Sequence, residues 1–334
     1  MNLLRNLALA AICTLPSTVT AQDACAPGET KIIVSLTTSL MGHPKGQTAL
    51  AVAEQVNAQM DGRLCVEVYG SSELYNDDDV LEAILRNDVQ MAAPSLSKFG
   101  EYTDRLQMFD LPFLFDGPTE VIDFFATPEA QSLLGDVADD GFTALGFWSN
   151  GMRNISATKP LRVPEDASGL TFRVEPSDVL SRQKEMIGAT PLKLPFSRVY
   201  EALETGEVQG QENTWSNIYT REFFTLQDGV TESNHSYLGY MVVMGQEFLA
   251  SLPAADREQF LAIVELTTHE YNRFAFETNQ ISRQNILDEG GFIRRLSDEE
   301  RELWREAFAE LYDEFEPIIG RELMNAAMNA GAKN

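Results

Sequence analysis

Two residues in one segment of the chain have the chemistry to hold a small anion. The run GLTFRV (Gly169 to Val174) places Arg173 on a short apolar strand, and GEVQGQEN (Gly206 to Asn213) ends a second strand at Asn213. A buried positive charge is costly unless an anion meets it, and the planar donor fork of arginine fits a carboxylate with two parallel bonds. We therefore expect Arg173 to bind the carboxylate of a ligand and Asn213 to help hold it. The alternative is an arginine paired with an internal Asp or Glu, which spacing alone leaves equally open.

The length and charge of the chain limit the classes of partner. Its 334 residues suggest two domains, since one domain commonly holds ~100–200 residues. The formal net charge of −26 argues against nucleic acid and anionic membrane surfaces as partners, because both favour basic patches. An anionic ligand remains compatible with this charge, since a buried arginine acts over a few ångströms, where salt screens weakly. We interpret the acidity as a solvated surface.

Residues 1–21 have the pattern of an export leader. Arg5 supplies the positive start, LALAAICTL is an apolar run, and Val19-Thr20-Ala21 has the small residues of a cleavage site. The run is too short to span a bilayer, and Ile12 stands where a lipoprotein would need a small residue before Cys13. We predict an exported, soluble, periplasmic protein cleaved near Ala21.

The predicted mature chain keeps two cysteines, Cys25 and Cys65. An even pair in an oxidising compartment predicts a disulfide, and both residues lie near the starts of strands that we expect to be neighbours. Two free thiols are the alternative. The sequence has no C-x-x-C motif, and its three histidines are too scattered for a metal site, so no metal or cofactor is predicted.

Strands and helices alternate from Lys31 onward, which predicts a mostly parallel sheet. Ligands of such sheets bind beyond the carboxyl ends of the strands. The loop with His43 and the AAPS run ending at Ser95 fall at such ends. The strand TALGFWSN is expected to end by delivering Asn150 to a crossover between domains, with Gly151 as a hinge.

The expected architecture is an α/β binding fold with two domains. Domain I is predicted to comprise residues 22–150 and 236–278, and domain II residues 151–235 and 279–334. Between Pro253 and Gly290 no helix breaker occurs, which predicts one helix of up to about 35 residues, or roughly 50 Å, long enough to bridge both domains. Trp215, just after Asn213, is either a wall of the ligand site or part of the core.

Motifs for catalysis are absent from the sequence. It contains no G-x-S-x-G elbow, no G-x-G-x-x-G run and no P-loop. Carboxylate pairs are too frequent here to indicate acid–base chemistry. We therefore predict a binding protein and not an enzyme.

Several blocks, in order, resemble the solute-binding proteins of TRAP transporters, the tripartite ATP-independent periplasmic carriers. They are ALGFWSNGMRNIS, PEDASGLTFRVEPSDV, LPFSRVYEALETGEVQGQENTWSNIY and SNHSYLGYMVV. The resemblance extends from about Lys31 into the helix after Leu252. It implies a type II-like periplasmic binding fold, with a long helix bridging both domains and the ligand in the cleft between them. It also implies that Arg173 forms a salt bridge with the ligand carboxylate, joined by Arg153 and Asn213.

The same resemblance narrows the ligand to a small organic acid. Blocks such as SSELYNDDDVLEAI and ENTWSNIYT look most like members that bind four-carbon dicarboxylates, whereas NGMRNIS also resembles members that bind sugar acids such as uronates. Thr214 stands where many relatives have proline, which leaves the floor of the pocket open. The implied partners are TRAP membrane subunits, and a monomer is expected. Use as an extracytoplasmic sensor subunit is the other reading.

Overall fold

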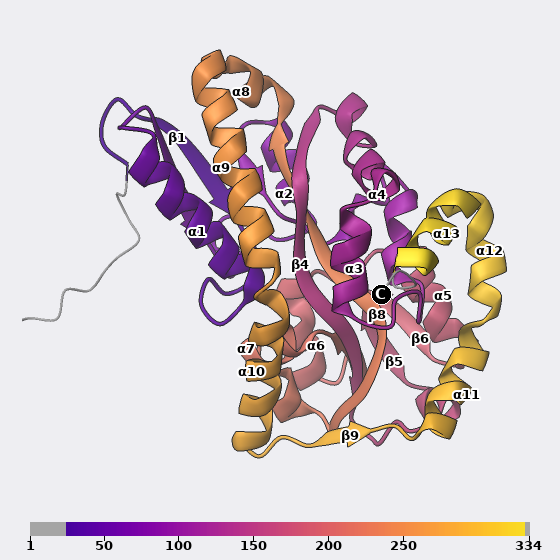
Figure 1. Cartoon of the computed structure of the whole chain (residues 1–334). Helices are drawn as coiled ribbons and strands as arrows, with labels where there is room; N and C mark the ends of the chain where they lie inside the picture. Colours follow the sequence, from indigo (N-terminus) through magenta and orange to yellow (C-terminus); the bar gives the residue numbers. More distant parts are fainter. Residues whose placement is uncertain (1–24, 331–334) are drawn as a thin grey trace, which may run out of the picture.

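The computed structural model describes residues 25–330, so the predicted leader lies outside the described residues. Its strands form one mixed sheet in the order β2-β1-β3-β8-β4-β7-β5-β6, with β9 beside β8 (Figure 1). The strands are β1 (Thr30–Ser35), β2 (Leu64–Tyr69), β3 (Met91–Ala92), β4 (Phe142–Ala157), β5 (Thr171–Val174), β6 (Thr190–Lys193), β7 (Gly210–Asn213), β8 (Gly229–Gly245) and β9 (Ile293–Arg295).

Parallel pairing occurs on both sides of a long antiparallel centre. Strand β1 pairs in parallel with β2 and β3, and β5 pairs in parallel with β6 and β7. Between these groups, β4 and β8 pair antiparallel from Phe142↔Gly245 to Ala157↔Gly229. The α/β two-domain prediction is confirmed, and the predicted strands at TFRV and GQEN are present.

The central strand β4 corrects one expectation. It does not end at Asn150 but continues to Ala157. The register shifts between Ser149 and Gly151, so the predicted crossover is a bulge inside a continuous strand. Strand β4 continues because β8 lies beside it along its whole length. The backbone groups of β4 therefore stay hydrogen-bonded to β8 beyond the bulge.

Helices cover both faces of the sheet and pack into three apolar clusters. The α-helices are α1 (Pro44–Gln59), α2 (Val80–Leu85), α3 (Pro118–Phe125), α4 (Pro128–Ser132), α5 (Asp178–Met186), α6 (Val199–Glu204), α7 (Trp215–Thr220), α8 (Gln246–Ser251), α9 (Ala254–Asn272), α10 (Ala275–Asp288), α11 (Asp298–Phe308), α12 (Glu310–Ile319) and α13 (Arg321–Ala330). Figure 1 shows α11 to α13 together on one side of the sheet, opposite α1 and α9.

The predicted 35-residue helix is interrupted. Helix α9 ends at Asn272 and α10 begins at Ala275, and the two follow each other almost end to end (Figure 1). The side chain of Asn272 explains the position of the break, because its amide oxygen accepts a bond from the Ser149 nitrogen and its amide nitrogen donates to the Phe147 oxygen. Since α9 packs on α1 and α10 packs on α7, the pair still bridges both ends of the sheet.

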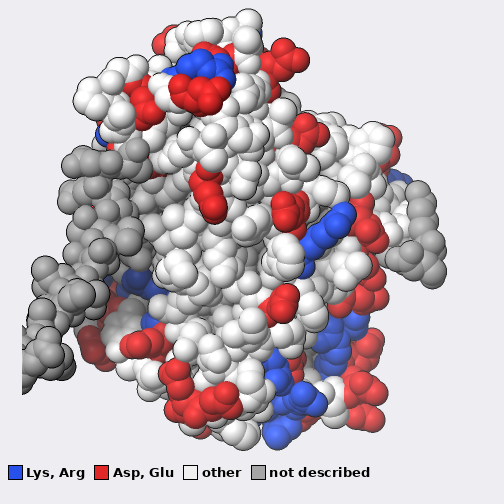
Figure 2. Space-filling view, turned by 60° about the vertical axis from the view of Figure 1, so that its left-hand side comes forward, with Lys and Arg blue, Asp and Glu red and all other residues white. Residues whose placement is uncertain are grey.

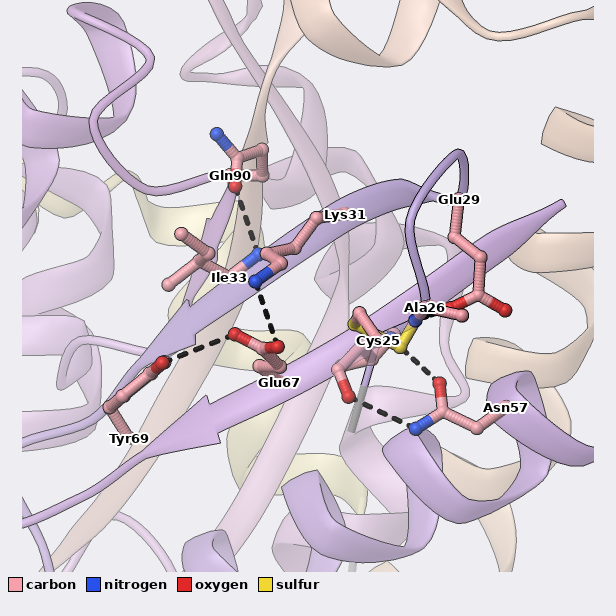
Figure 3. The surroundings of a disulfide bond; sticks show 11 residues. Cys25, Ala26, Glu29, Lys31, Ile33, Asn57, Glu67, Tyr69 and Gln90 are labelled. Carbon is pink, nitrogen blue, oxygen red and sulfur yellow. Dashed lines mark hydrogen bonds and ion pairs between the residues drawn. A yellow bond between two sulfur atoms is a disulfide. The ribbon is translucent and has the colours of Figure 1, made fainter. Parts of the chain in front are cut away.

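The predicted disulfide joins Cys25 to Cys65, with 5.5 Å between the two Cα atoms. It ties the segment before β1 to the start of β2 (Figure 3). Nearby, the Asn57 side chain of α1 accepts a bond from the Val66 nitrogen at 2.7 Å and donates one to the Val66 oxygen at 3.1 Å. The disulfide and the Asn57 amide together fix β2 to the segment before β1 and to α1.

The surface agrees with the acidic composition. Figure 2, which turns the side carrying α1 forward, shows acidic side chains spread over the visible face around a largely uncharged centre. Among the helices of residues 25–330, none combines the length and the apolar composition needed to cross a membrane.

Candidate functional site

A small cavity lies where the carboxyl ends of several strands meet. Its volume, measured as the space open to the centre of a water molecule, is about 20 Å³. Segments after β1 and β3 line one side, and the end of β7 with the start of α7 lines the other. Its lining residues are Thr37, Thr38, Lys45, Asp77, Ser95, Glu175, Phe196, Asn213, Asn217, Leu238 and Tyr240. Sheets of this kind bind their ligands beyond the carboxyl ends of the strands, so the cavity lies where a ligand site is expected.

Arg173 lies on β5, one strand away from Asn213. Phe172 pairs with Gly210, so the register places Arg173 beside Gln211 and on the same face of the sheet as Asn213. Its Nε donates to the Leu194 oxygen at 2.9 Å. Its Nη2 is buried and has no hydrogen-bond partner. A buried donor without a partner is rare in folded proteins, and here it marks a position where a carboxylate would complete the bonding of the guanidinium.

Arg153 has internal partners. Its guanidinium forms ion pairs with Asp110 at 2.5 Å and Glu175 at 2.8 Å, and donates to the Tyr237 oxygen at 2.9 Å. The internal pairing considered for Arg173 is thus found at Arg153. Burial would raise the pKa of Glu175, but the charges of Arg153 and Arg173 lower it to about 2. The predicted ligand contact of Arg153 stays a prediction, and its bonds make it the fixed centre of a buried ion network.

Ser95 and Asn213 both line the cavity, and their contact with a ligand stays a prediction. The Ser95 hydroxyl donates to a Glu175 carboxylate oxygen at 2.6 Å. The Asn213 amide donates to Gln211 at 2.8 Å and accepts from Asn217 at 2.6 Å. Each side chain is therefore held by neighbours at the wall of the cavity.

His43 lies behind the cavity wall. Its Nδ1 accepts from the Lys45 nitrogen at 3.1 Å, which leaves the proton on Nε2, where it is donated to the Asn217 amide oxygen at 2.9 Å. Burial and the charge of Lys45 lower the pKa of His43 to about 3, although its bond to Asn217 opposes them. The neutral imidazole holds two cavity residues, Lys45 and Asn217, in place.

Asn150 and Trp215 also lie outside the cavity lining. The Asn150 amide donates to the Tyr240 hydroxyl at 2.8 Å, so it positions an aromatic residue of the cavity wall. Trp215 packs in an apolar cluster with Phe196 and Ile218, and the guanidinium of Arg283 lies 5.6 Å from its ring centroid. Of its two predicted roles, core packing accounts for these contacts.

Lys45 is the site residue that sequence reasoning missed. It lies in the first turn of α1, yet it is only 2% exposed. The sequence feature that could have identified it is the lysine in the first turn of a helix. The helix dipole disfavours a cation at this position, so another interaction must favour it. Gly46 permits this packing, since a Cβ there would come within 2.2 Å of the Ser39 oxygen.

Three hydrogen bonds connect the two sides of the cavity. The Asp77 carboxylate accepts from the Phe196 nitrogen at 3.0 Å, Ser95 donates to Glu175, and His43 donates to Asn217. Each bond joins a residue before position 100 to one after position 170. The described structure therefore holds the two sides together around the cavity.

Two other features of the described residues resemble binding sites. A larger groove shares Asp77 with the cavity. Most of its charged lining residues are acidic, among them Asp78, Glu82, Glu101 and Asp104, which does not suit an anion. The group of potential metal ligands found in residues 25–330 is Cys25, Glu29 and Cys65, and its two sulfurs already form the disulfide. His235 forms hydrogen bonds with Ser233 and Glu212.

Comparison with known proteins places these features in context. Residues 37–317 match the family described as bacterial extracellular solute-binding protein, family 7. The C4-dicarboxylate-binding periplasmic protein DctP of Vibrio cholerae is 44% identical over 309 residues, which are 92% of this chain and 93% of that protein. A TRAP periplasmic solute-binding protein from Shewanella oneidensis, solved with bound succinate, is 41% identical, with a TM-score of 0.88 over 90% of this chain and 99% of the other.

A sugar acid-binding protein gives a more distant match. The protein comes from Advenella mimigardefordensis and was solved in complex with galactonate. It is 26% identical, with a TM-score of 0.86 over 91% of this chain and 98% of the other.

Proposed function

The chain belongs to family 7 of the bacterial extracellular solute-binding proteins, and we propose that it captures a four-carbon dicarboxylate in the cavity beside Arg173. The observation that carries this proposal is the buried Nη2 of Arg173, which has no partner within the described residues. A carboxylate would accept from it and neutralise the guanidinium. The ligands named for the Vibrio and Shewanella relatives support a dicarboxylate.

We propose further that the chain delivers this ligand to TRAP membrane subunits from the periplasm, as a receptor without catalytic activity of its own. Family membership supports this role. The galactonate-bound relative keeps a sugar acid as the second candidate, and the hydroxyl and amide groups of Thr37, Thr38 and Asn217 are compatible with a hydroxylated ligand. A direct comparison of the two ligand classes decides between them.

Replacing Arg173 with lysine is expected to weaken succinate binding at least ten-fold while the fold survives. A point ammonium cannot reproduce the two parallel bonds of a guanidinium, and a hydrogen bond to a charged group contributes about 1.5–3 kcal/mol. Isothermal titration calorimetry of both proteins with succinate, L-malate and galacturonate measures the change.

Arg182→Lys is the matched control, because Arg182 is an exposed arginine of α5 that pairs with Glu314. We expect the control to bind succinate like the parent protein. Unchanged affinity in Arg173→Lys would contradict the role of Arg173, and tighter binding of galacturonate than of succinate would favour the sugar-acid alternative.

Ligand binding is expected to make the molecule more compact. Asp77–Phe196, Ser95–Glu175 and His43–Asn217 close the cavity, and a ligand that contacts both sides favours the closed state over an open one. Small-angle X-ray scattering should show a smaller radius of gyration with saturating succinate. An unchanged radius, with binding confirmed by calorimetry, would mean that the free protein is already closed.

A further inference from the structure

Most of the buried cations in residues 25–330 form ion pairs with carboxylates. Six lysine and arginine side chains are buried within residues 25–330. Four of them form ion pairs: Lys98 with Asp77, Arg153 with Asp110, Lys184 with Glu212, and Arg294 with Asp228. The two without a carboxylate partner within 4.0 Å in the described residues are Arg173 and Lys45.

Of these two cations, Lys45 lies at the start of α1 and lines the cavity, whereas Arg173 lies on β5 next to β7, the strand that ends at the cavity residue Asn213. The Lys45 ammonium has only neutral contacts: it donates to Thr37 Oγ1 at 3.3 Å and to the Ala93 oxygen at 3.1 Å, and it lies 4.0 Å from the centroid of the Tyr240 ring. A buried ammonium whose hydrogen-bond partners are all neutral is costly to maintain, and the more distant charges of Asp77 and Glu175 offset that cost only in part.

We propose that Lys45 binds the second carboxylate of the ligand, opposite Arg173, so that the cavity selects a dianion over a monoanion. This inference rests on the proposed function, because it takes the first carboxylate to be held by Arg173. Two cations without internal partners match the two charges of a four-carbon dicarboxylate. A singly charged acid would leave one of them buried and unpaired, and that cost is the basis of selection.

The preference for a dicarboxylate is expected to depend on pH, because it requires Lys45 to be protonated. Burial lowers the pKa of Lys45 to about 7, while the charges of Asp77 and Glu175 oppose the shift. The other groups beside it, His43 and Tyr240, are both neutral, because burial lowers the pKa of the first and raises that of the second. A bound carboxylate favours the charged ammonium and raises its pKa. Near pH 8, succinate binding is therefore expected to take up a proton.

The test compares succinate with succinamate, in which a neutral amide replaces one carboxylate. The parent protein should bind succinate at least ten-fold more tightly than succinamate. Lys45→Met should lose at least ten-fold in affinity for succinate and keep its affinity for succinamate within about three-fold. Lys193→Met is the matched control, since Lys193 is a half-exposed lysine outside the cavity that pairs with Asp178, and it should behave like the parent.

Proton uptake gives a second readout. Calorimetry at pH 8 in buffers of different ionisation enthalpy should show uptake of between half a proton and one proton per succinate for the parent protein, and close to none for Lys45→Met. A methionine variant that fails to fold, judged by circular dichroism, would be replaced by Lys45→Gln, whose amide can still donate to Thr37 and Ala93.

The outcomes separate the two proposals. Unchanged succinate affinity in Lys45→Met, or equal affinity of the parent for succinate and succinamate, overturns the role of Lys45 and leaves the proposed function standing. A parent protein that binds neither succinate nor malate overturns the proposed function itself.

Discussion

Replacing Arg153 with methionine is expected to lower the free energy of unfolding by about 3–5 kcal/mol, the usual cost of removing one partner of a buried ion pair. The variant leaves Asp110 and Glu175 inside the protein without their cation. Urea denaturation followed by circular dichroism measures the loss. Arg105→Met is the control, because Arg105 pairs with Asp136 at a more exposed position, where an ion pair contributes ~0–1 kcal/mol.

The pH dependence of this loss follows from the same charges. In the parent protein the pKa of Glu175 lies near 2, below its unfolded value. Its stabilisation is therefore present above pH ~4.3 and disappears as the pH falls toward 2. Burial already raises the pKa of Asp110 in the parent protein, against the charge of Arg153. Removing Arg153 raises the pKa of both carboxyls above their parent values, which favours proton uptake on folding, so the deficit should shrink between pH 8 and pH 5. An equal, pH-independent loss in both variants would show that the Arg153 network contributes no more than a surface pair.

Removing the disulfide is expected to cost about 3–4 kcal/mol of stability. Cys25 and Cys65 are separated by 40 residues, and in the chain-entropy model a closed loop of this size stabilises by about that amount. The double variant Cys25→Ala, Cys65→Ala should unfold at a correspondingly lower urea concentration and still bind succinate, since the disulfide is at the opposite end of β1 and β2 from the cavity.

Thiol labelling provides the independent check on the disulfide. The unreduced, denatured mature protein should contain no reactive cysteine, because the predicted cleavage removes Cys13. Two labelled residues at positions 25 and 65 would contradict the disulfide in the exported protein.

The sequence predicted those parts of the site that depend on local pattern. Arg173 and Asn213 lie at the ends of short strands with clear turns, so their position on one edge of the sheet could be read from alternation and chemistry. The disulfide could be predicted because the mature chain keeps two cysteines in an oxidising compartment. Lys45 escaped the prediction because its role depends on Ala93, Thr37 and Tyr240, which only the folded sheet brings together.

The elements that the sequence mispredicted are set by tertiary partners. Local residues around Asn150 and Gly151 indicate a turn, but pairing with β8 continues the strand. No breaker stands between α9 and α10, yet Asn272 bonds to the backbone of Ser149 and Phe147 at the point where the helix is interrupted. Arg153 has the same chemistry as Arg173, and only the position of Asp110 and Glu175 distinguishes the two.

The position of β8 late in the sequence delays completion of the sheet during synthesis. Met91 of β3 pairs with Met244 of β8, which is made 244 − 91 = 153 residues later. At roughly 5–20 residues per second, synthesis of that interval takes ~8–30 s. During this time the N-terminal half has an incomplete sheet and lacks the β8 side chains Leu238, Val242 and Met244 from its core. The nascent chain therefore cannot complete its sheet or close this core until β8 has been synthesised.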